Sequence, residues 1–182
     1  MKVTPTGLPE VLLLEPKVFG DERGFFMESW NARTFRETTG LDVQFVQDNH
    51  SRSARNVLRG IHYQVVSPQG KLVRVVTGAV FDVAVDLRRS SSNFGKWVGF
   101  DLSAENMRQL WVPPGFGHAF LVTSESADFL YKTTEFWVLE HDRSLRWNDP
   151  VVAVRWPLGG AQPLLGAKDA AAPLLADAEV FS

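Results

Sequence analysis

Short apolar segments rich in valine recur along the chain from Val57 onward, and this spacing constrains the fold more than any other feature. Residues 72–77 and 79–87 are two such segments, and the Gly78 between them is typical of a hairpin turn. Only residues 31–39 have the pattern of a helix, with Asn31 as the N-cap and Gly40 just past the end. An α/β fold needs helices between its strands, so the sequence predicts an all-β sandwich or small barrel. The other segments expected to be extended are residues 11–14, 25–30, 41–47, 57–64, 96–102, 108–112, 118–123 and 129–137.

Composition excludes several classes of function. The 182 residues contain no repeat, charge block or Ser/Gly-rich linker, which predicts one domain spanning residues 1–182. The net charge is only -2, so no general affinity for nucleic acid or membranes is expected and any anion binding must be local. The chain has no cysteine, which excludes disulfides, thiolate metal ligands and cysteine nucleophiles. The apolar run at residues 11–14 is too short for a signal or membrane segment, and a cytoplasmic location is therefore predicted.

A histidine in a strand-like run is the first candidate for chemistry. Alternate residues of a strand share a face, so His62 is grouped with Gly60 and Gln64, whereas Arg59 falls on the opposite face. A bulge at Gly60 would turn Arg59 and His62 toward one ligand. A single strand histidine is more often structural than functional, so His62 needs partners from elsewhere in the chain.

Tyrosine is rare in this chain, and one of the two lies in residues 129–137. Alternation along these residues places Tyr131, Thr133, Glu135 and Trp137 on one face. A phenol beside a large flat ring would suit a proton-transfer site with an adjoining stacking surface. The alternative is a core tyrosine whose hydroxyl is satisfied within the protein.

The segment at residues 113–118 matches a metal-binding turn of the cupin superfamily, Pro-x-Gly-x-x-His, that leads into a strand. The first metal motif of that superfamily is His-x-His followed by glutamate, but here Gln64 replaces the second histidine. His62 and His118 alone are too few for a transition-metal site. The sequence therefore predicts a cupin scaffold without a metal site, in which His62 is free to act as a base.

The basic residues that could bind an anion are few and dispersed: Arg23, Arg59, Lys71 and Lys168. For each of them, the alternative to a role in binding is a solvated position on the surface. No glycine-rich phosphate loop precedes a helix, so the sequence gives no support for a Walker or Rossmann site.

Blocks along nearly the whole chain carry a family resemblance, at residues 19–26, 45–50, 57–64, 70–74, 80–86, 94–97, 102–106, 129–134 and 147–150. Together they resemble the dTDP-4-dehydrorhamnose 3,5-epimerase family. The resemblance implies a cupin-type jelly roll (a double-stranded β-helix) with short peripheral helices, which forms a homodimer and uses no metal or organic cofactor. It also implies inversion at C3 and C5 of dTDP-4-dehydro-6-deoxy-D-glucose, giving dTDP-4-dehydro-L-rhamnose on the way to dTDP-L-rhamnose.

Four residues match the family's catalytic positions. The resemblance implies that His62 is the base. It also implies that Asp169 orients His62 and stabilises its protonated form, as the carboxylate does for the histidine of a catalytic triad. Tyr131 matches the acid that delivers a proton to the opposite face of the enolate. Lys71 matches the position that offers positive charge to the enolate oxygen.

The resemblance also implies a set of substrate contacts. Arg23, Arg59 and His118 match diphosphate and sugar contacts, and a planar guanidinium suits a diphosphate because it donates two hydrogen bonds at once. Trp137 matches the aromatic position that stacks on the base. The remaining substrate-binding positions are Phe26, Glu28, Gln47, Asp48, Asn49, Asp82, Asp142 and Lys168.

Three other functions remain open at this point. A 3- or 5-monoepimerase of the same family would keep the same histidine and tyrosine. A metal-dependent cupin and a non-catalytic sugar-nucleotide binding module are the alternatives from other classes. Within the resemblance, Gly166 and Ala167 replace the usual Ser-Asp or Ser-Glu pair, which weakens the expected helix cap before Asp169.

Overall fold

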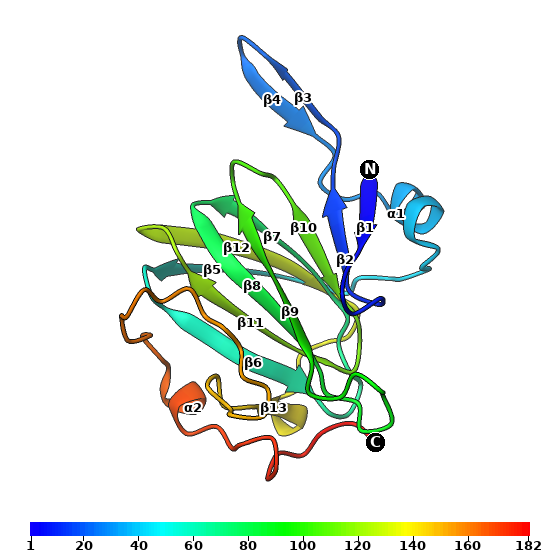
Figure 1. Cartoon of the computed structure of the whole chain (residues 1–182). Helices are drawn as coiled ribbons and strands as arrows, with labels where there is room; N and C mark the ends of the chain where they lie inside the picture. Colours follow the sequence, from blue (N-terminus) through cyan, green and yellow to red (C-terminus); the bar gives the residue numbers. More distant parts are fainter.

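Two antiparallel sheets packed face to face form the body of the computed structural model, which describes residues 1–182 (Figure 1). The six-stranded sheet has the order β1 (Lys2–Pro5), β2 (Leu12–Glu15), β10 (Gln109–Val112), β7 (Lys71–Thr77), β12 (Ser126–Thr133) and β5 (Gln47–Ala54). The five-stranded sheet has the order β13 (Asp142–Ser144), β6 (Leu58–Gln64), β11 (Phe116–Val122), β8 (Ala79–Asp86) and β9 (Trp97–Ser103). The all-β prediction is confirmed.

The main core lies between the two sheets. Val73 and Val75 of β7 face Val80 and Ala84 of β8, and all four are buried. Such alternation of inward apolar side chains is what a sandwich requires of each strand. The Phe129 ring of β12 stacks with the Phe120 ring of β11 in the opposite sheet.

The chain crosses from one sheet to the other at Gly78, and the predicted hairpin there is wrong. β7 and β8 are consecutive but belong to different sheets. Gly78 has φ +74°, and a Cβ atom at this position would lie 2.0 Å from the backbone oxygen of Ser126. The glycine is therefore required by a tight crossing, which looks the same in sequence as a hairpin turn.

The predicted helix is confirmed as α1 (Ala32–Thr39), with both caps where the sequence places them. The Asn31 side chain accepts a hydrogen bond from the backbone N–H of Thr34, and Gly40 adopts the left-handed conformation at φ 75°. Phe35 is buried against the outer face of the six-stranded sheet, where its ring lies 5.8 Å from that of Trp111. The other helices are η1 (Leu139–His141) and α2 (Ala167–Ala170). None of the helices combines the length and the hydropathy that a membrane-spanning segment needs.

The extended segment expected at residues 41–47 is wrong, because the strand in this part of the chain is β5, which begins only at Gln47 and continues through residues not expected to be a strand. Its sequence is almost wholly polar, and it forms the edge of the six-stranded sheet, paired only with β12. An edge strand beside a cavity buries little on either face, so it lacks the apolar alternation by which strands are recognised.

A two-stranded hairpin, β3 (Val18–Asp21) and β4 (Gly24–Met27), projects away from both sheets (Figure 1). The strand expected at residues 25–30 thus ends at residue 27 and pairs within this hairpin. Phe19, Phe25 and Phe26 are 53%, 63% and 68% exposed on it. Phe19 and Phe26 are paired across the hairpin and share one face, whereas Phe25 lies on the other. Exposed apolar side chains gathered in this way are typical of a segment that contacts another protein surface.

The tail after β13 covers the outer face of the five-stranded sheet, running below β6 in Figure 1. Ile61 and Tyr63 of β6 pack with Leu145 and Leu175, and the Tyr63 hydroxyl donates to the backbone oxygen of Glu179 at 2.7 Å. As predicted, the tail contains only brief regular pieces. Its apolar side chains nevertheless pack on the five-stranded sheet and complete a second buried hydrophobic cluster.

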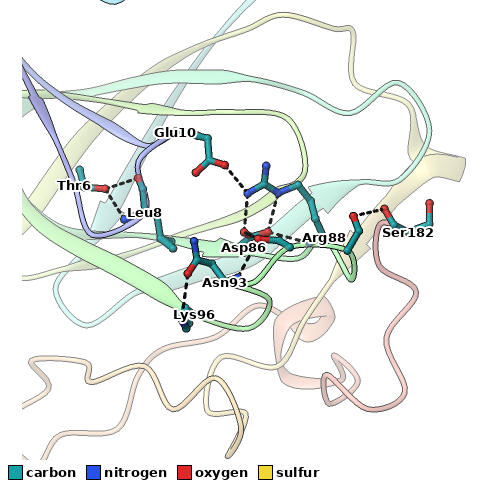
Figure 2. A network of polar contacts seen from close by, with 10 residues as sticks. Thr6, Leu8, Glu10, Asp86, Arg88, Asn93, Lys96 and Ser182 are labelled. Atoms are coloured by element: carbon teal, nitrogen blue, oxygen red, sulfur yellow. Dashed lines mark hydrogen bonds and ion pairs between the residues drawn. The ribbon is translucent and has the colours of Figure 1, made fainter.

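A polar network fixes the turn between β8 and β9 (Figure 2). Asp86 is fully buried and accepts hydrogen bonds from the Arg88 guanidinium at 2.9 and 2.7 Å and from the Ser91 hydroxyl at 2.6 Å. Arg88 also bonds Glu10 at 3.0 Å. Burial alone would raise the pKa of Asp86, but these donors lower it. The network connects the N-terminal segment to the loop after β8.

Candidate active site

A cavity of about 260 Å³ opens between the two sheets, and six of the candidate residues line it. Both sheets contribute to it, so residues far apart in sequence face one space. We call it the inter-sheet cavity. Its lining residues are Asn49, His50, Ser51, Arg59, His62, Lys71, His118, Phe120, Phe129 and Tyr131.

A bulge in β6 brings Arg59 and His62 to this cavity together. His62 is paired with His118 of β11, but Arg59 is paired with Phe120, so three steps on β6 match two on β11. Gly60 lies inside the bulge with φ +122°, and a Cβ atom there would be 2.4 Å from the Ala119 Cβ. The predicted bulge at Gly60 is confirmed. It explains how residues of opposite parity can serve one ligand.

His62 is bonded through Nε2 to the Asp169 carboxylate at 2.5 Å. Asp169 is only 5% exposed, although Gly166 gives α2 no side-chain cap, as the sequence suggested. The missing cap therefore does not prevent the contact across 107 positions. One ring nitrogen is occupied by a carboxylate and the other makes no hydrogen bond within the protein, which is the arrangement of an oriented base.

A second histidine–carboxylate pair lies beside the first. His118 Nε2 is 3.0 Å from Asp82 Oδ2, and both residues are buried. Burial raises the pKa of Asp82, while His118 and Lys71 act to lower it. His62 and His118 thus have one carboxylate each, and no group of three or more His, Cys, Asp or Glu residues is placed to hold a metal ion.

Lys71 contributes a cation without a partner. It is 8% exposed, lines the cavity, and forms no hydrogen bond or ion pair within the protein. Burial lowers the pKa of Lys71 to about 8, although Asp142 and Asp82 act to raise it. A buried ammonium without a carboxylate partner is available to a negative charge that develops in the cavity.

The two tyrosines of the chain differ in one respect that bears on function. The Tyr63 hydroxyl is bonded to the tail, whereas the Tyr131 hydroxyl makes no hydrogen bond within the protein. Burial raises the pKa of Tyr131, with Arg59 opposing and Asp142 adding to the shift. Tyr131 therefore stays protonated at neutral pH and faces the cavity as a potential acid, unlike a core tyrosine with a satisfied hydroxyl.

Several cavity residues were not anticipated from the sequence. Ser53 is buried and accepts a hydrogen bond from Arg59 Nε at 3.0 Å, which fixes the guanidinium. Phe120 and Phe129 stack across the two sheets with ring centroids 4.2 Å apart, and His118 lies against Phe129. Phe129 shares a strand face with Tyr131, and that alternation was the signal that could have identified it.

The alternation expected from Tyr131 through Trp137 is wrong, because β12 ends at Thr133. Trp137 lies beyond the strand and is 52% exposed. Its backbone N–H donates to the Gln47 side chain at 3.1 Å, and Gln47 in turn donates to Asn49 at 2.9 Å. Three of the predicted substrate positions are thus connected at the margin of the cavity.

Three further predicted positions form ion pairs. Asp142 of β13 bonds Lys168 of α2, and the negative charge of Asp142 affects the pKa of both Lys71 and Tyr131. Asp48 instead pairs with Lys132 at 2.8 Å and is not among the residues lining the cavity. Asp142 and Lys168 do not line the cavity either, but the charges of both affect the pKa of Lys71. Asp48 lines a neighbouring pocket that also includes Asn49 and Tyr131.

Arg23, Phe26 and Glu28 are not brought to the cavity within one chain. Arg23 lies on the projecting hairpin and pairs with Asp21 at 2.5 Å. Phe26 is on the same hairpin, and Glu28 accepts a hydrogen bond from Asn31 at 3.0 Å. Arg23 and Phe26 thus share the hairpin, Glu28 lies just before the start of α1, and none of the three lines the cavity.

The fold and the cavity define a class of protein, a cupin-type β-sandwich whose interior is equipped for proton transfer. A model of the dTDP-4-dehydrorhamnose 3,5-epimerase family matches residues 5–177, and the chain belongs to this family. It is 61% identical over 181 residues to the dTDP-4-dehydrorhamnose 3,5-epimerase of Pseudomonas aeruginosa, covering 100% of this chain and 99% of the relative. The corresponding enzyme of Salmonella typhimurium is 58% identical over 176 residues, 96% of each chain.

Among solved structures, the chain is similar to dTDP-6-deoxy-D-glucose-3,5-epimerase of Legionella pneumophila in complex with dTDP-4-keto-L-rhamnose. The TM-score is 0.95 at 51% sequence identity, and the match covers 98% of this chain and 94% of the other. The predicted family and cupin-type fold are confirmed.

Proposed function

We propose that this protein inverts C3 and C5 of dTDP-4-dehydro-6-deoxy-D-glucose and releases dTDP-4-dehydro-L-rhamnose. The observation that carries the proposal is the His62–Asp169 pair in one cavity with a protonated tyrosine. Membership of the epimerase family supports the choice of substrate.

Deprotonation would begin at the hydrogens beside the C4 ketone. The ketone acidifies both neighbouring carbons, so one base can serve C3 and C5 in turn. His62 accepts the proton on its free ring nitrogen, since an imidazole has suitable basicity near neutral pH. Asp169 stabilises the imidazolium that forms, and the unpaired Lys71 ammonium faces the oxygen of the enolate.

Reprotonation would come from the other side of the ring. His62 belongs to the five-stranded sheet and Tyr131 to the six-stranded sheet, so the two groups approach a bound sugar from opposite walls. A proton delivered by the Tyr131 hydroxyl then inverts the carbon that His62 deprotonated. Arg59 is suited to hold the diphosphate, because Ser53 occupies only its Nε.

The reaction can be tested with the 4-keto sugar nucleotide in heavy water. The expected product carries deuterium at both C3 and C5, and a coupled reductase consumes NADPH as the product forms. Deuterium at only one carbon would instead identify a monoepimerase. Tight binding of the sugar nucleotide without any exchange would identify a binding module, and activity that depends on stoichiometric iron, manganese or nickel would identify a metal-dependent cupin.

We further propose that the protein is a homodimer in which the hairpin β3–β4 of one chain completes the cavity of the other. The support is that Arg23 and Phe26 match substrate contacts but lie on a projecting hairpin with three exposed phenylalanines. Burying these rings against a second copy would offset their exposure and place Arg23 near a bound nucleotide. The cytoplasmic location remains a prediction.

Shared sites predict complementation between two inactive chains. A mixed dimer of His62→Asn and Arg23→Ala chains has one site with both wild-type groups. Co-expression should therefore restore about one quarter of the wild-type activity at low substrate concentration, because half of the dimers are mixed and each has one intact site. Sedimentation should show a dimer. A purely monomeric protein, or a mixture no more active than its parents, would contradict the proposal.

A further inference from the structure

The segment that carries Trp137 is held by side chains and not by a sheet. Residues 134–138 lie between the end of β12 and η1, and the Trp137 indole is half exposed. No other aromatic ring forms a pair with it, so little besides the backbone sets its direction. A ring that stacks on a nucleobase binds more tightly if it is already held in place. If the ring becomes ordered only when the nucleotide binds, the entropy it loses reduces the affinity.

Gln64 bonds the peptide groups on both sides of Trp137. Its Nε2 donates to the Phe136 oxygen at 3.1 Å, and its Oε1 accepts from the Val138 N–H at 2.8 Å. The same Nε2 donates a second bond, to the Ser67 oxygen at 2.7 Å. Gln64 is 3% exposed, so these bonds form in a buried environment where leaving one unmade is costly.

Only a primary amide can make this set of bonds. The glutamine side chain has two N–H donors and one carbonyl acceptor, and all are used here. Glutamate has no donor at neutral pH, histidine cannot donate twice from one atom, and methionine can do neither. This requirement gives a physical reason for glutamine at the position where the cupin metal motif has its second histidine.

We propose that Gln64 is a positioning residue that sets Trp137 for stacking on the base of the nucleotide. The inference rests on the proposed function and on the stacking role that the family resemblance implies for Trp137. Gln64 lies two residues after His62 on β6. One strand therefore positions both the histidine that acts on the sugar and the segment that contacts the nucleobase. Gln47 adds a further bond, from the Trp137 N–H.

The test is Gln64→Glu, which keeps the shape of the side chain but removes both donors. The KM for the 4-keto sugar nucleotide should rise about tenfold, within the range that base–aromatic stacking contributes. The kcat should stay within about twofold, since no group that touches the reacting carbons changes. Gln69→Glu is the matched control, because Gln69 bonds the same segment but at the Glu135 oxygen, two residues from Trp137. Its KM should change less than about twofold.

A double-mutant cycle separates positioning from general damage to the fold. Trp137→Ala should raise KM, and Gln64→Glu should add no further rise in that background. Additive effects, or a fall in kcat alone, would overturn the proposal. If Trp137→Ala itself leaves KM unchanged, the stacking role in the proposed function fails. If Trp137→Ala raises KM but Gln64→Glu does not, only the positioning role fails. Gln64→Met, which removes the bonds without adding a charge, replaces the glutamate variant if that variant does not fold.

Discussion

Replacing His62 with asparagine is expected to lower kcat by about a thousandfold, because asparagine cannot accept the proton that general-base catalysis requires. The asparagine amide is shorter than the imidazole and does not reach the position of Nε2, so Asp169 also loses this hydrogen bond. The affinity for dTDP should stay within about threefold of the wild-type value, since the His62 side chain acts on the sugar and not on the nucleotide. The coupled reductase assay gives kcat, and calorimetry with dTDP gives the affinity.

The control for this variant is His141→Asn. His141 belongs to η1 and is not among the residues that line the inter-sheet cavity. Its substitution should leave kcat within about twofold, because the side chain does not line the cavity in which the reaction is proposed to occur. If His62→Asn keeps more than about a tenth of the turnover, His62 is not the base, because loss of a general base costs far more than that.

Replacing Tyr131 with phenylalanine is expected to separate proton exchange from inversion. His62 can still remove a proton and return it to the same face, so deuterium from heavy water should enter the substrate with its configuration retained. Formation of the inverted product should fall by about a hundredfold or more, the contribution of a positioned general acid. Proton NMR measures the exchange, and the coupled assay measures the inversion.

Tyr63→Phe is the matched control, because it removes the other phenol of the chain. Burial raises the pKa of Tyr63 to about 12, and its hydroxyl bonds the tail at Glu179. Loss of that bond should reduce the free energy of unfolding by about 1 kcal/mol and leave kcat unchanged. Equal loss of exchange and inversion in Tyr131→Phe would show that the phenol does more than deliver the second proton.

Features that depend on neighbouring residues were predictable from the sequence. The caps of α1 at Asn31 and Gly40 are local hydrogen-bond and backbone effects, and both are as expected. The bulge at Gly60 followed from the parity of Arg59 and His62, and the register with β11 confirms it. In each case a few adjacent residues contain the whole signal.

Features that depend on pairing partners were not predictable in this way. Gly78 indicates a turn but does not specify whether the next strand joins the same sheet, and here it does not. Strand β5 lacks apolar alternation because it is a polar edge. The contact of His62 with Asp169 depends on the path of the tail, and only the family resemblance predicted it.

The stacked Phe120 and Phe129 rings have a consequence for the stereochemistry of the reaction. They join the two walls from which His62 and Tyr131 extend, with 4.2 Å between ring centroids. Sheets in a sandwich pack about 10 Å apart, and that separation leaves room for one sugar ring with a reactive group on each side. The handedness of the product would then depend on the thickness of the sandwich, and apolar side chains that never donate a proton would help to decide which sugar is made.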